Sequence, residues 1–461
     1  MLNNYVSNAH IASLKKIVHK KEDKPELVYP LRLSILTQFY PPDYAATGQL
    51  IEELAINLEK LGNDVRIFTG QPGYAFQKDS APTKERMGKI LIQRSRISRI
   101  LNGRIRGKAL NGFVFFLRAA LHLIKKVNRN DILLLTTAPP FLPLIGYLAK
   151  LFFDVPYVCL IYDLYPDIAV ELNVVPAHNL LVKWWDWLNK QVWQNADSII
   201  VLSSTMKERV QDKCPEIGDK IAVIHNWANP DRIVPIAKQD NWFAHKFNLV
   251  NKFTVLYSGN MGRCHEMDTI LATAQLLQNE PVEFVFIGGG AKREACIERV
   301  RQIGLDNCQF LPYQDKQDLP YSLTACDLSL VTISHGMEGL VAPSKFYGML
   351  AAGRPVAAIC EPHSYLRSLI AEANCGAAFS NGDAVDIARF IRRLAADREL
   401  AQQMGIAGRY YLQFNFTPEI IARQYLKTLQ QALEAQEIRQ TERRRRRNSK
   451  WGQRRIKRLS S

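Results

Sequence analysis

The sequence predicts an α/β protein built from two doubly wound parallel-sheet domains that face each other across a cleft. With 461 residues, of which 47% are hydrophobic, the chain is longer than one hydrophobic core usually organises. Short apolar runs alternate with stretches of helical periodicity, which is the pattern of βαβ units. This alternation fades after residue 229 and restarts at residue 253, so the same arrangement is expected twice.

The first domain is expected over residues 31–228. Its first unit reads LRLSILTQFY, then the helical LIEELAINLEKLG, then DVRIFT. The later runs DILLLTT, YVCLIYD, SIIVLSS and KIAVIHN are apolar stretches, as buried parallel strands are. Residues 1–30 are polar and charged without the apolar block of a signal peptide, and we expect a poorly ordered lead-in there.

The second domain is expected over residues 229–405. Its strands are FTVLYSG, VEFVFIGGG, CQFLPY and DLSLVTI, with helices near residues 268–278 and 291–304. Residues 406–440 contain apolar side chains at spacings of three and four, which predicts an amphipathic helix packed back on the body of the protein. We expect residues 441–461 to form a disordered basic tail.

Much of the positive charge lies at the C-terminal end. Ten of the 60 lysines and arginines fall within residues 443–458, which contain no acid, so the formal charge of +16 drops to +6 for the rest of the chain. Such a run binds phosphate polymers without specificity, and Trp451 offers a ring that stacks on a base. A nucleic-acid-binding protein is therefore one rival interpretation. No nucleic-acid motif lies in the body, and we expect no specific nucleic-acid partner.

The eight cysteines form no CxxC pair. This spacing argues against a zinc knuckle and against a disulfide framework. It is typical of a protein in the reducing cytosol.

Two segments raise the question of membrane contact. Residues 132–153 have the length of a span but contain three prolines and Lys150, so we expect a buried strand followed by a helix, with a helix that dips into a bilayer face as the alternative. Residues 84–108 carry nine lysines and arginines against Glu85 alone, and FVFFLRAALHLIKKVNR follows. Basic beside apolar side chains suits an anionic membrane surface, while a basic helix packed on the core is equally consistent.

Four loops at predicted strand ends are candidates for a binding site. The first, QFYPPDYAATG at residues 38–48, opens a helix, where backbone N–H groups bind a phosphate and Gly48 permits close approach. It is neither a GxGxxG fingerprint nor a Walker A loop, which disfavours a dinucleotide oxidoreductase and a P-loop enzyme. An ordinary strand-to-helix turn is the alternative.

The second loop leads into GLVAPSKFYGMLAAGRPVAAI. Pro343 and Ser344 predict a helix start, and Gly353 predicts its end before the strand RPVAAI. Lys345 lies in the first turn, where its charge opposes the helix dipole, a conflict that a bound anion relieves. A lysine that reaches out to water is the alternative.

The third and fourth loops are rich in glycine. YSGNMGRCHEMD follows a strand and contains Gly259, Asn260 and Arg263, and FIGGG ends a strand with Gly289 among three glycines that let a ligand approach the backbone. Open α/β sheets bind ligands at the carboxyl ends of their strands, so we expect the four loops to converge on the cleft.

In order, these motifs resemble family 4 of the retaining glycosyltransferases. The resemblance is carried by FYPPDYAATGQLIEELAINLEKLGNDV, IHN, LYSGNMG, FVFIGGG, NCQFLPYQDKQDLPYSLTACDLSLV and APSKFYGMLAAGRPVAAI, and it covers residues 31–436. It is closest to bacterial transferases of the exopolysaccharide and colanic acid type. The resemblance implies the glycosyltransferase B fold, in which a Rossmann-like acceptor domain precedes a Rossmann-like nucleotide-sugar domain.

The resemblance also implies a function in the assembly of surface polysaccharide or exopolysaccharide. A hexosyl or N-acetylhexosaminyl group would pass from a nucleotide sugar, with a UDP-sugar expected, to a lipid-linked or polysaccharide acceptor with retention of configuration. The enzyme would be cytoplasmic and peripheral at the inner face of the plasma membrane, in contact with anionic lipid. Side chains near Tyr313 would select the base, and the expected donor-binding residues are Gly48, Gly259, Asn260, Gly289, Tyr313, Ser344 and Lys345.

The sequence departs from the family pattern at its acidic pair. Family 4 enzymes commonly carry two glutamates separated by seven residues, but the corresponding positions here are Leu340 and Gly348. Glu338 lies two residues from the first position and is the candidate replacement for the sugar-contacting carboxylate. The PSK pattern resembles the subgroup that includes aminosugar and fucosamine transferases.

A second departure concerns the positive charge on the diphosphate. The usual arginine after Gly259 is Asn260, and the usual lysine is His265, which we expect to have a structural or hydrogen-bonding role. Arg263 and Lys345 are therefore the candidates for that charge. Breaking a sugar to diphosphate bond develops negative charge on the leaving phosphate, which preorganised cations stabilise.

On the acceptor side, Asp163 in YDLYPD is the candidate for orienting a hydroxyl, with capping of the following helix as the alternative. No Asp-x-Asp motif occurs, so we expect no obligatory metal and no cofactor. A sugar-nucleotide epimerase of the same fold is a second rival, disfavoured because it needs paired carboxylates near the leaving group. An inactive relative is the third.

Overall fold

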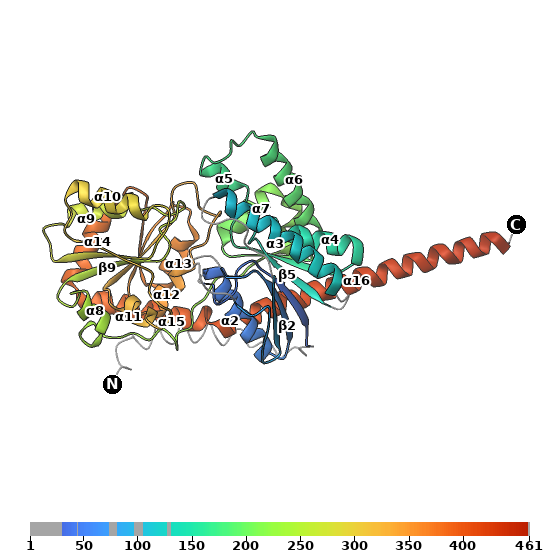
Figure 1. Ribbon diagram of the computed structural model, residues 1–461, viewed down its shortest axis with the longest axis horizontal. Helices are drawn as coiled ribbons and strands as arrows, with labels where there is room; N and C mark the ends of the chain where they lie inside the picture. The colour runs from blue at the N-terminus through green and yellow to red at the C-terminus, as the bar shows by residue number, and fades with distance from the viewer. Residues whose placement is uncertain (1–29, 44, 73–80, 96–104, 127–130, 460–461) are drawn as a thin grey trace.

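The computed structural model describes residues 30–459 with gaps at 44, 73–80, 96–104 and 127–130. Two α/β units lie side by side, each with one mainly parallel sheet covered by helices (Figure 1). The predicted fold class is confirmed, and the first sheet ends at Val223 while the second begins at Phe253. The expected lead-in lies, apart from residue 30, outside the described residues.

The N-terminal sheet has eight strands in the order β3-β4-β2-β1-β5-β6-β7-β8. They are β1 (Arg32–Leu36), β2 (Asp64–Thr69), β3 (Lys84–Met87), β4 (Ile90–Arg94), β5 (Ile132–Thr136), β6 (Tyr157–Ile161), β7 (Ser198–Val201) and β8 (Ile221–Val223). Neighbouring strands are parallel except β3 and β4. Every residue of β5 and β6 is buried, which explains why their sequences are continuously apolar rather than alternating.

Right-handed crossovers place the helices of this domain on opposite faces of the sheet. The crossover from β1 to β2 through α2 (Ala46–Lys60) runs one way along the sheet, whereas those through α3 (Ile105–Lys126), α4 (Pro143–Phe153), α6 (Leu180–Asn195) and α7 (Ser204–Lys213) run the other way. In the second layer α4 packs between α3 and α6. The short α5 (Asp167–Glu171) follows β6.

The C-terminal sheet has six parallel strands in the order β11-β10-β9-β12-β13-β14. They are β9 (Phe253–Ser258), β10 (Val282–Ile287), β11 (Cys308–Leu311), β12 (Leu328–Thr332), β13 (Val356–Ile359) and β14 (Gly376–Phe379). The helices are α8 (Trp242–Lys246), α9 (Asp268–Leu276), α10 (Arg293–Ile303), α11 (Leu319–Thr324), α12 (Lys345–Ala351), α13 (Tyr365–Ala373), α14 (Ala384–Ala396) and α15 (Arg398–Asn415). Gly353, just beyond α12, has φ +63°, which agrees with its predicted role at the end of that helix.

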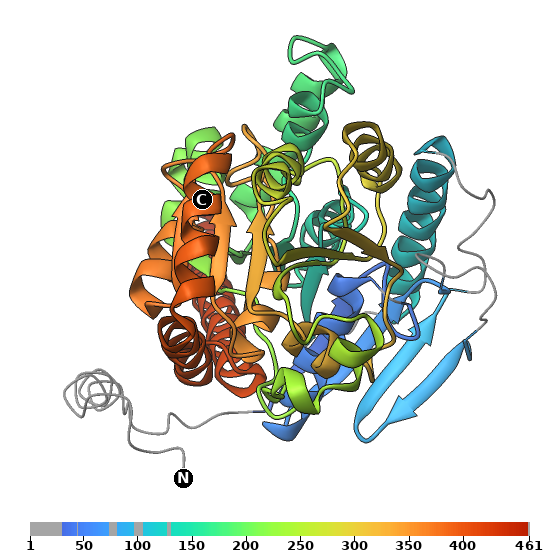
Figure 2. The ribbon, with the colours of Figure 1, turned by 90° about the vertical axis from the view of Figure 1, so that its left-hand side faces the viewer.

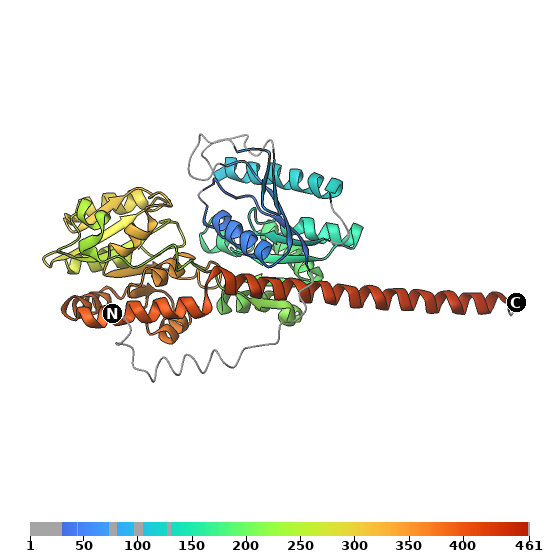
Figure 3. The same cartoon turned by 90° about the horizontal axis from the view of Figure 1, so that it is seen from below.

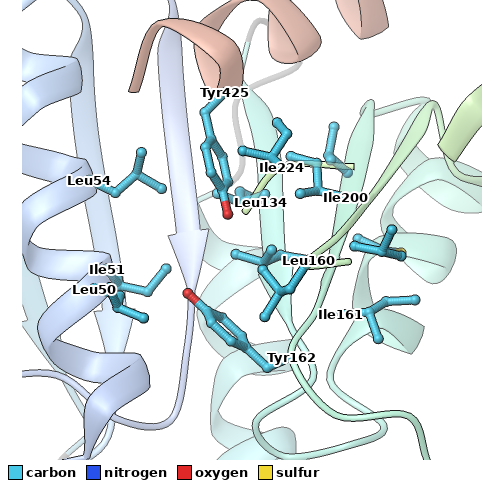
Figure 4. Packing of buried hydrophobic residues seen from close by; sticks show 14 of the residues in the cluster. Leu50, Ile51, Leu54, Leu134, Leu160, Ile161, Tyr162, Ile200, Ile224 and Tyr425 are labelled. Atoms are coloured by element: carbon cyan, nitrogen blue, oxygen red, sulfur yellow. The ribbon is translucent and has the colours of Figure 1, made fainter. Parts of the chain in front are cut away.

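The final helix, α16 (Pro418–Leu459), returns to the N-terminal domain (Figure 3). It packs against α2, β6 and β7, and the ring of Tyr425 is fully buried near Leu54 and Leu134 (Figure 4). Burying the ring stabilises the fold, although its hydroxyl has no hydrogen-bond partner among the described residues and offsets part of the gain. The predicted docking helix is therefore present, but it begins at Pro418, because the preceding residues belong to α15 in the C-terminal domain.

The prediction of a disordered tail was wrong for residues 441–459, which continue α16. Lysine and arginine have high helix propensity, and the docked first half of α16 provides the nucleus from which the helix extends. Gln436 Nε2 donates to the backbone oxygen of Asp154 at 2.6 Å, near the point where α16 leaves the domain.

The two segments considered for membrane contact fold differently from each other. Residues 132–153 form β5, a turn and α4, as predicted. Within the described part of the chain, no helix has both the length and the apolar character needed to span a bilayer. Residues 84–94 form the hairpin β3–β4 at the edge of the N-terminal sheet (Figure 2), which was not predicted because its first strand, KERM, is exposed at every position.

Candidate active site

A cleft of about 600 Å³ opens between the two domains at the carboxyl ends of their strands. The N-terminal domain contributes the start of α2 and the loop after β6, and the C-terminal domain contributes the loops after β9 and β11 and the segment before α12. This is where open α/β sheets bind ligands. Seven predicted residues line it: Asp163, Gly259, Asn260, Arg263, Tyr313, Ser344 and Lys345.

Two predicted glycines do not line the cleft and serve packing instead. A Cβ atom on Gly48 would lie 3.0 Å from the backbone nitrogen of Tyr40, so glycine lets α2 pack closely on the loop before it. A Cβ atom on Gly289 would lie 3.0 Å from Cε2 of Tyr313. Gly289 thus lies under a ring that does line the cleft, and its effect on a ligand is indirect.

Glu338 also lies outside the cleft. Its side chain is completely buried where the domains meet, and Oε1 accepts a 2.7 Å hydrogen bond from Thr205 Oγ1. Its backbone oxygen accepts from Arg209 Nε at 3.1 Å. The predicted contact with the sugar does not fit this position, because the carboxylate does not line the cleft and Oε1 is held by Thr205 of the N-terminal domain. Oε2 is buried without a hydrogen-bond partner among the described residues.

Lys345, the first residue of α12, carries the central positive charge of the cleft. Its Nζ donates to Tyr257 Oη at 2.6 Å, lies 3.9 Å from the centroid of that ring, and reaches the backbone oxygen of Asn260 at 3.4 Å. No ion pair in the described part of the chain involves Lys345. Desolvation without an opposing carboxylate lowers the pKa of Lys345 to about 7.

The surroundings of Lys345 explain two further features of the sequence. Gly259 has φ +127°, and a Cβ atom there would lie 3.3 Å from Lys345 Cε, so the position requires glycine. Tyr257, two residues earlier at the end of β9, was not singled out from the sequence. Its hydroxyl donates to the Asn260 oxygen at 2.9 Å while it accepts from Lys345, and burial raises its pKa, so it stays protonated.

Arg263 and His265 differ in character although they share one loop. Arg263 is exposed and lines the cleft. His265 Nδ1 lies 3.0 Å from the carbonyl oxygen of Thr332, so this nitrogen carries the proton and Nε2 keeps a lone pair. Burial, followed by the charge of Lys345, lowers the pKa of His265 to about 3. His265 is therefore a neutral hydrogen-bonding group, as expected.

Asp163 faces the cleft from the opposite domain. Its backbone pairs with Val341, and Leu164 N donates to Leu340 O at 3.0 Å, which holds the loop against the segment before α12. The side chain is exposed toward the cleft, and partial desolvation by the surrounding cleft walls raises its pKa to about 6. The capping alternative is not observed, because α5 begins at Asp167 without a side-chain cap.

Contacts across the cleft that were not predicted involve two acids of α2. Glu52 lies 3.6 Å from Lys316 Nζ, and Glu53 lies 3.5 Å from Arg232 Nη1. Trp227 Nε1 donates to Glu53 at 3.0 Å. Because these acids lie more than 170 positions from their basic partners in the sequence, a single sequence does not reveal the pairs.

The described residues contain no group of three or more His, Cys, Asp or Glu side chains that could hold a metal ion. All eight cysteines are free.

Two family models match the chain. The model described as Glycosyltransferase Family 4 matches residues 47–232, and the model described as Glycosyl transferases group 1 matches residues 238–410. Together they cover most of the chain, one on each domain. The protein therefore belongs to the family 4 glycosyltransferases with the glycosyltransferase B fold.

Two curated relatives carry glycosyltransferase names, and solved structures share the fold. A probable glycosyltransferase of Pseudomonas aeruginosa, WbjE, is 28% identical over 305 residues, 65% of this chain and 74% of its own. The putative colanic acid biosynthesis glycosyl transferase WcaI of Escherichia coli is 29% identical over 38% of this chain and 43% of its own. Sucrose-phosphate synthase of Thermosynechococcus elongatus matches with a TM-score of 0.70 at 18% identity, over 88% of this chain and 100% of that one. Anabaena HepE in complex with UDP-glucose matches with a TM-score of 0.62 at 13% identity, over 87% of this chain and 99% of that one.

Proposed function

We propose that the protein transfers a hexosyl or N-acetylhexosaminyl group from a UDP-sugar to a lipid-linked or polysaccharide acceptor during assembly of a surface polysaccharide, with retention of configuration. The main support for this proposal is the ammonium group of Lys345, which lines the cleft between the two sheets and forms no ion pair with any described residue. The names of WbjE and WcaI and the UDP-glucose complex of HepE support the choice of pathway and donor.

The leaving diphosphate needs positive charge on one side of the cleft. None of the carboxylates that the structure describes pairs with Lys345, and Arg263 lies on a neighbouring loop of the same domain. A bound diphosphate would supply the missing counter-charge and keep Lys345 protonated. Positive groups placed where charge develops in the transition state lower the barrier to departure of the leaving group.

The acceptor hydroxyl would approach from the N-terminal domain. With a pKa of about 6, Asp163 is ionised at neutral pH and accepts a hydrogen bond from a hydroxyl in the cleft. Retention is expected from the family, by attack on the face from which the phosphate leaves. In that arrangement the departing phosphate oxygen takes the hydroxyl proton, and Asp163 orients the nucleophile.

The proposed contact with an anionic membrane is supported by α3. This helix has two apolar stripes on opposite sides. Phe115, Ala119 and Leu123 are buried against the sheet, whereas Phe113, Leu117, Leu121 and Ile124 are 46–63% exposed. Arg118 and Lys125 are exposed on the same helix. Apolar residues beside basic ones suit a peripheral contact with anionic lipid, which we place at the inner, cytoplasmic face of the plasma membrane.

The direct test supplies radiolabelled UDP-sugars and a membrane lipid extract. Transfer of label into the lipid phase or into polymer, with release of UDP and with the α-configuration of the donor preserved by NMR, is the expected result. Hydrolysis or epimerisation without transfer would contradict the proposal and favour the epimerase. The same assay with EDTA tests the expectation that no metal is required.

A further inference from the structure

The first half of α6 exposes an unusual amount of apolar surface. Leu180 is 80% exposed, and Leu181, Trp184 and Trp187 are 54–56% exposed. Together with α5, this part of the chain projects from the N-terminal domain (Figures 1 and 2). Four large apolar side chains on one projecting helix exceed the scattered exposure of an ordinary surface and indicate a binding function.

The inner side of the same helix reaches the candidate active site. Its second half lines a narrow apolar pocket that leaves room for about 20 Å³. Asp163 and Tyr165 belong both to this pocket and to the interdomain cleft. Further lining residues are Phe141, Leu144, Trp185, Leu188 and Val192. An apolar path therefore runs from the proposed acceptor carboxylate along α6 to its exposed end.

The charges on α6 identify the kind of partner. Its one acid, Asp186, accepts a 2.6 Å hydrogen bond from Lys213 Nζ, and Lys213 also bonds Asp167. Lys183 and Lys190 are exposed. Tryptophan rings with neighbouring lysines suit the boundary between lipid chains and phosphate headgroups.

We propose that α6 inserts its exposed face into the membrane interface and guides the hydrocarbon chain of a lipid-linked acceptor to Asp163. This inference rests on the proposed function and selects the lipid-linked acceptor over a soluble polysaccharide. The chain would lie along Trp184 and Leu188, and its phosphate-linked sugar would enter the cleft. The narrow pocket must widen for an isoprene unit, and the ring of Trp185, stacked on Tyr165 with the centroids 6.2 Å apart, is the side chain that would rotate.

The first test measures binding to vesicles. The double variant Trp184→Gln/Trp187→Gln is compared with Trp242→Gln, a partly exposed tryptophan on α8 of the other domain. We expect at least about tenfold weaker binding of the double variant to phosphatidylglycerol vesicles and unchanged binding of the control. Brominated lipid should quench the fluorescence of the wild type and lose most of this effect in the double variant. Equal binding of all three proteins would overturn the inference.

The second test addresses the pocket with a defined probe. In saturating UDP, farnesyl diphosphate is compared with inorganic diphosphate by thermal shift, in the wild type and in Leu188→Gln. A shift with the farnesyl compound alone, lost in Leu188→Gln, is expected. Equal shifts with both compounds, or a change of oligomeric state in the α6 variants by ultracentrifugation, would overturn the inference. Stabilisation by UDP alone reports separately on the proposed function, so the two failures are distinguishable.

Discussion

The ammonium group of Lys345 lies 2.6 Å from the hydroxyl of Tyr257 and 3.9 Å from the centroid of its ring. Both contacts are with a neutral group. Among the residues that the structure describes, no carboxylate forms an ion pair with Lys345. A desolvated cation without a counter-charge costs the fold free energy, and a bound diphosphate reverses that cost. Lys345 is therefore the group in this cleft that a bound diphosphate would stabilise most directly.

Replacing Lys345 with alanine should lower kcat/KM by about 10²–10³, the usual effect of removing one group that stabilises charge in a transition state. Lys246→Ala, on α8 at the surface of the same domain, is the matched control and should keep full activity. Steady-state kinetics with a UDP-sugar make the comparison. Equal activities of the two variants would remove Lys345 from the mechanism.

Binding of UDP should weaken above pH 7, because the free lysine, with its pKa of about 7, must then take up a proton before it pairs with the diphosphate. We expect Kd to rise by up to about tenfold per pH unit. Calorimetry in buffers of different ionisation enthalpy measures the proton uptake directly. In Lys345→Met the uptake should vanish; its persistence would assign the proton to another group.

The charge on Lys345 should favour binding of UDP but lower the stability of the ligand-free fold. The pKa of Lys345 is lowered from 10.5 to about 7 on folding, so the unfolded chain binds more protons between these values. The contribution of Lys345 to the free energy of unfolding therefore rises with pH across that window and is least favourable below pH 7. Lys345→Met should raise Tm more at pH 6 than at pH 10 in ligand-free protein. A uniform loss of Tm would contradict this prediction.

Asp163→Asn should lower kcat with little change in the affinity for UDP. In the wild type kcat should fall below pH 6, where the carboxylate becomes protonated, and the variant should lose this acid limb. Because the folded pKa is raised, ionisation of Asp163 destabilises the fold as pH rises from about 4 to about 6, so the variant should be more stable at neutral pH. Asp212→Asn, an exposed acid of the same domain, is the control. An unchanged pH profile in Asp163→Asn would exclude its role.

Contact with anionic membrane should depend on the exposed stripe of α3. Leu117→Gln/Leu121→Gln should bind phosphatidylglycerol vesicles at least about tenfold more weakly, while Tm stays within a few degrees because both side chains face solvent. Leu276→Gln, 46% exposed on α9, is the matched control. If both variants bind the vesicles as well as the wild type does, the exposed stripe of α3 is not the membrane contact.

Elements with strong local patterns were predictable from the sequence. The central strands are apolar runs bounded by turn residues, and α12 begins and ends where Pro343 and Gly353 indicate. The hairpin β3–β4 was missed because an edge strand exposed at every position has no apolar alternation. The tail was misjudged because its charge density concealed the helix propensity of lysine and arginine.

The sequence predicted those site residues whose place in the cleft follows from their position in a loop at a strand end or helix start. Gly259, Asn260 and Asp163 lie in the cleft because they follow strands, and strand ends meet there. Lys345 lies there because the helix after β12 begins at the same edge. Glu338 was misplaced because two residues of offset in a loop moved its side chain from the cleft to Thr205 in the interdomain contact. Tyr257 and the pair formed by Glu52 and Lys316 depend on tertiary packing, which spacing in one sequence does not reveal.

Binding of a nucleoside diphosphate at Lys345 is best examined by thermal stabilisation with UDP, GDP, ADP and dTDP, with and without EDTA, in the wild type, Lys345→Ala and Lys246→Ala. We expect UDP to stabilise the wild type and Lys246→Ala regardless of EDTA, and Lys345→Ala to lose most of this effect. No stabilisation by any nucleoside diphosphate, together with a shift in the presence of RNA, would contradict this expectation.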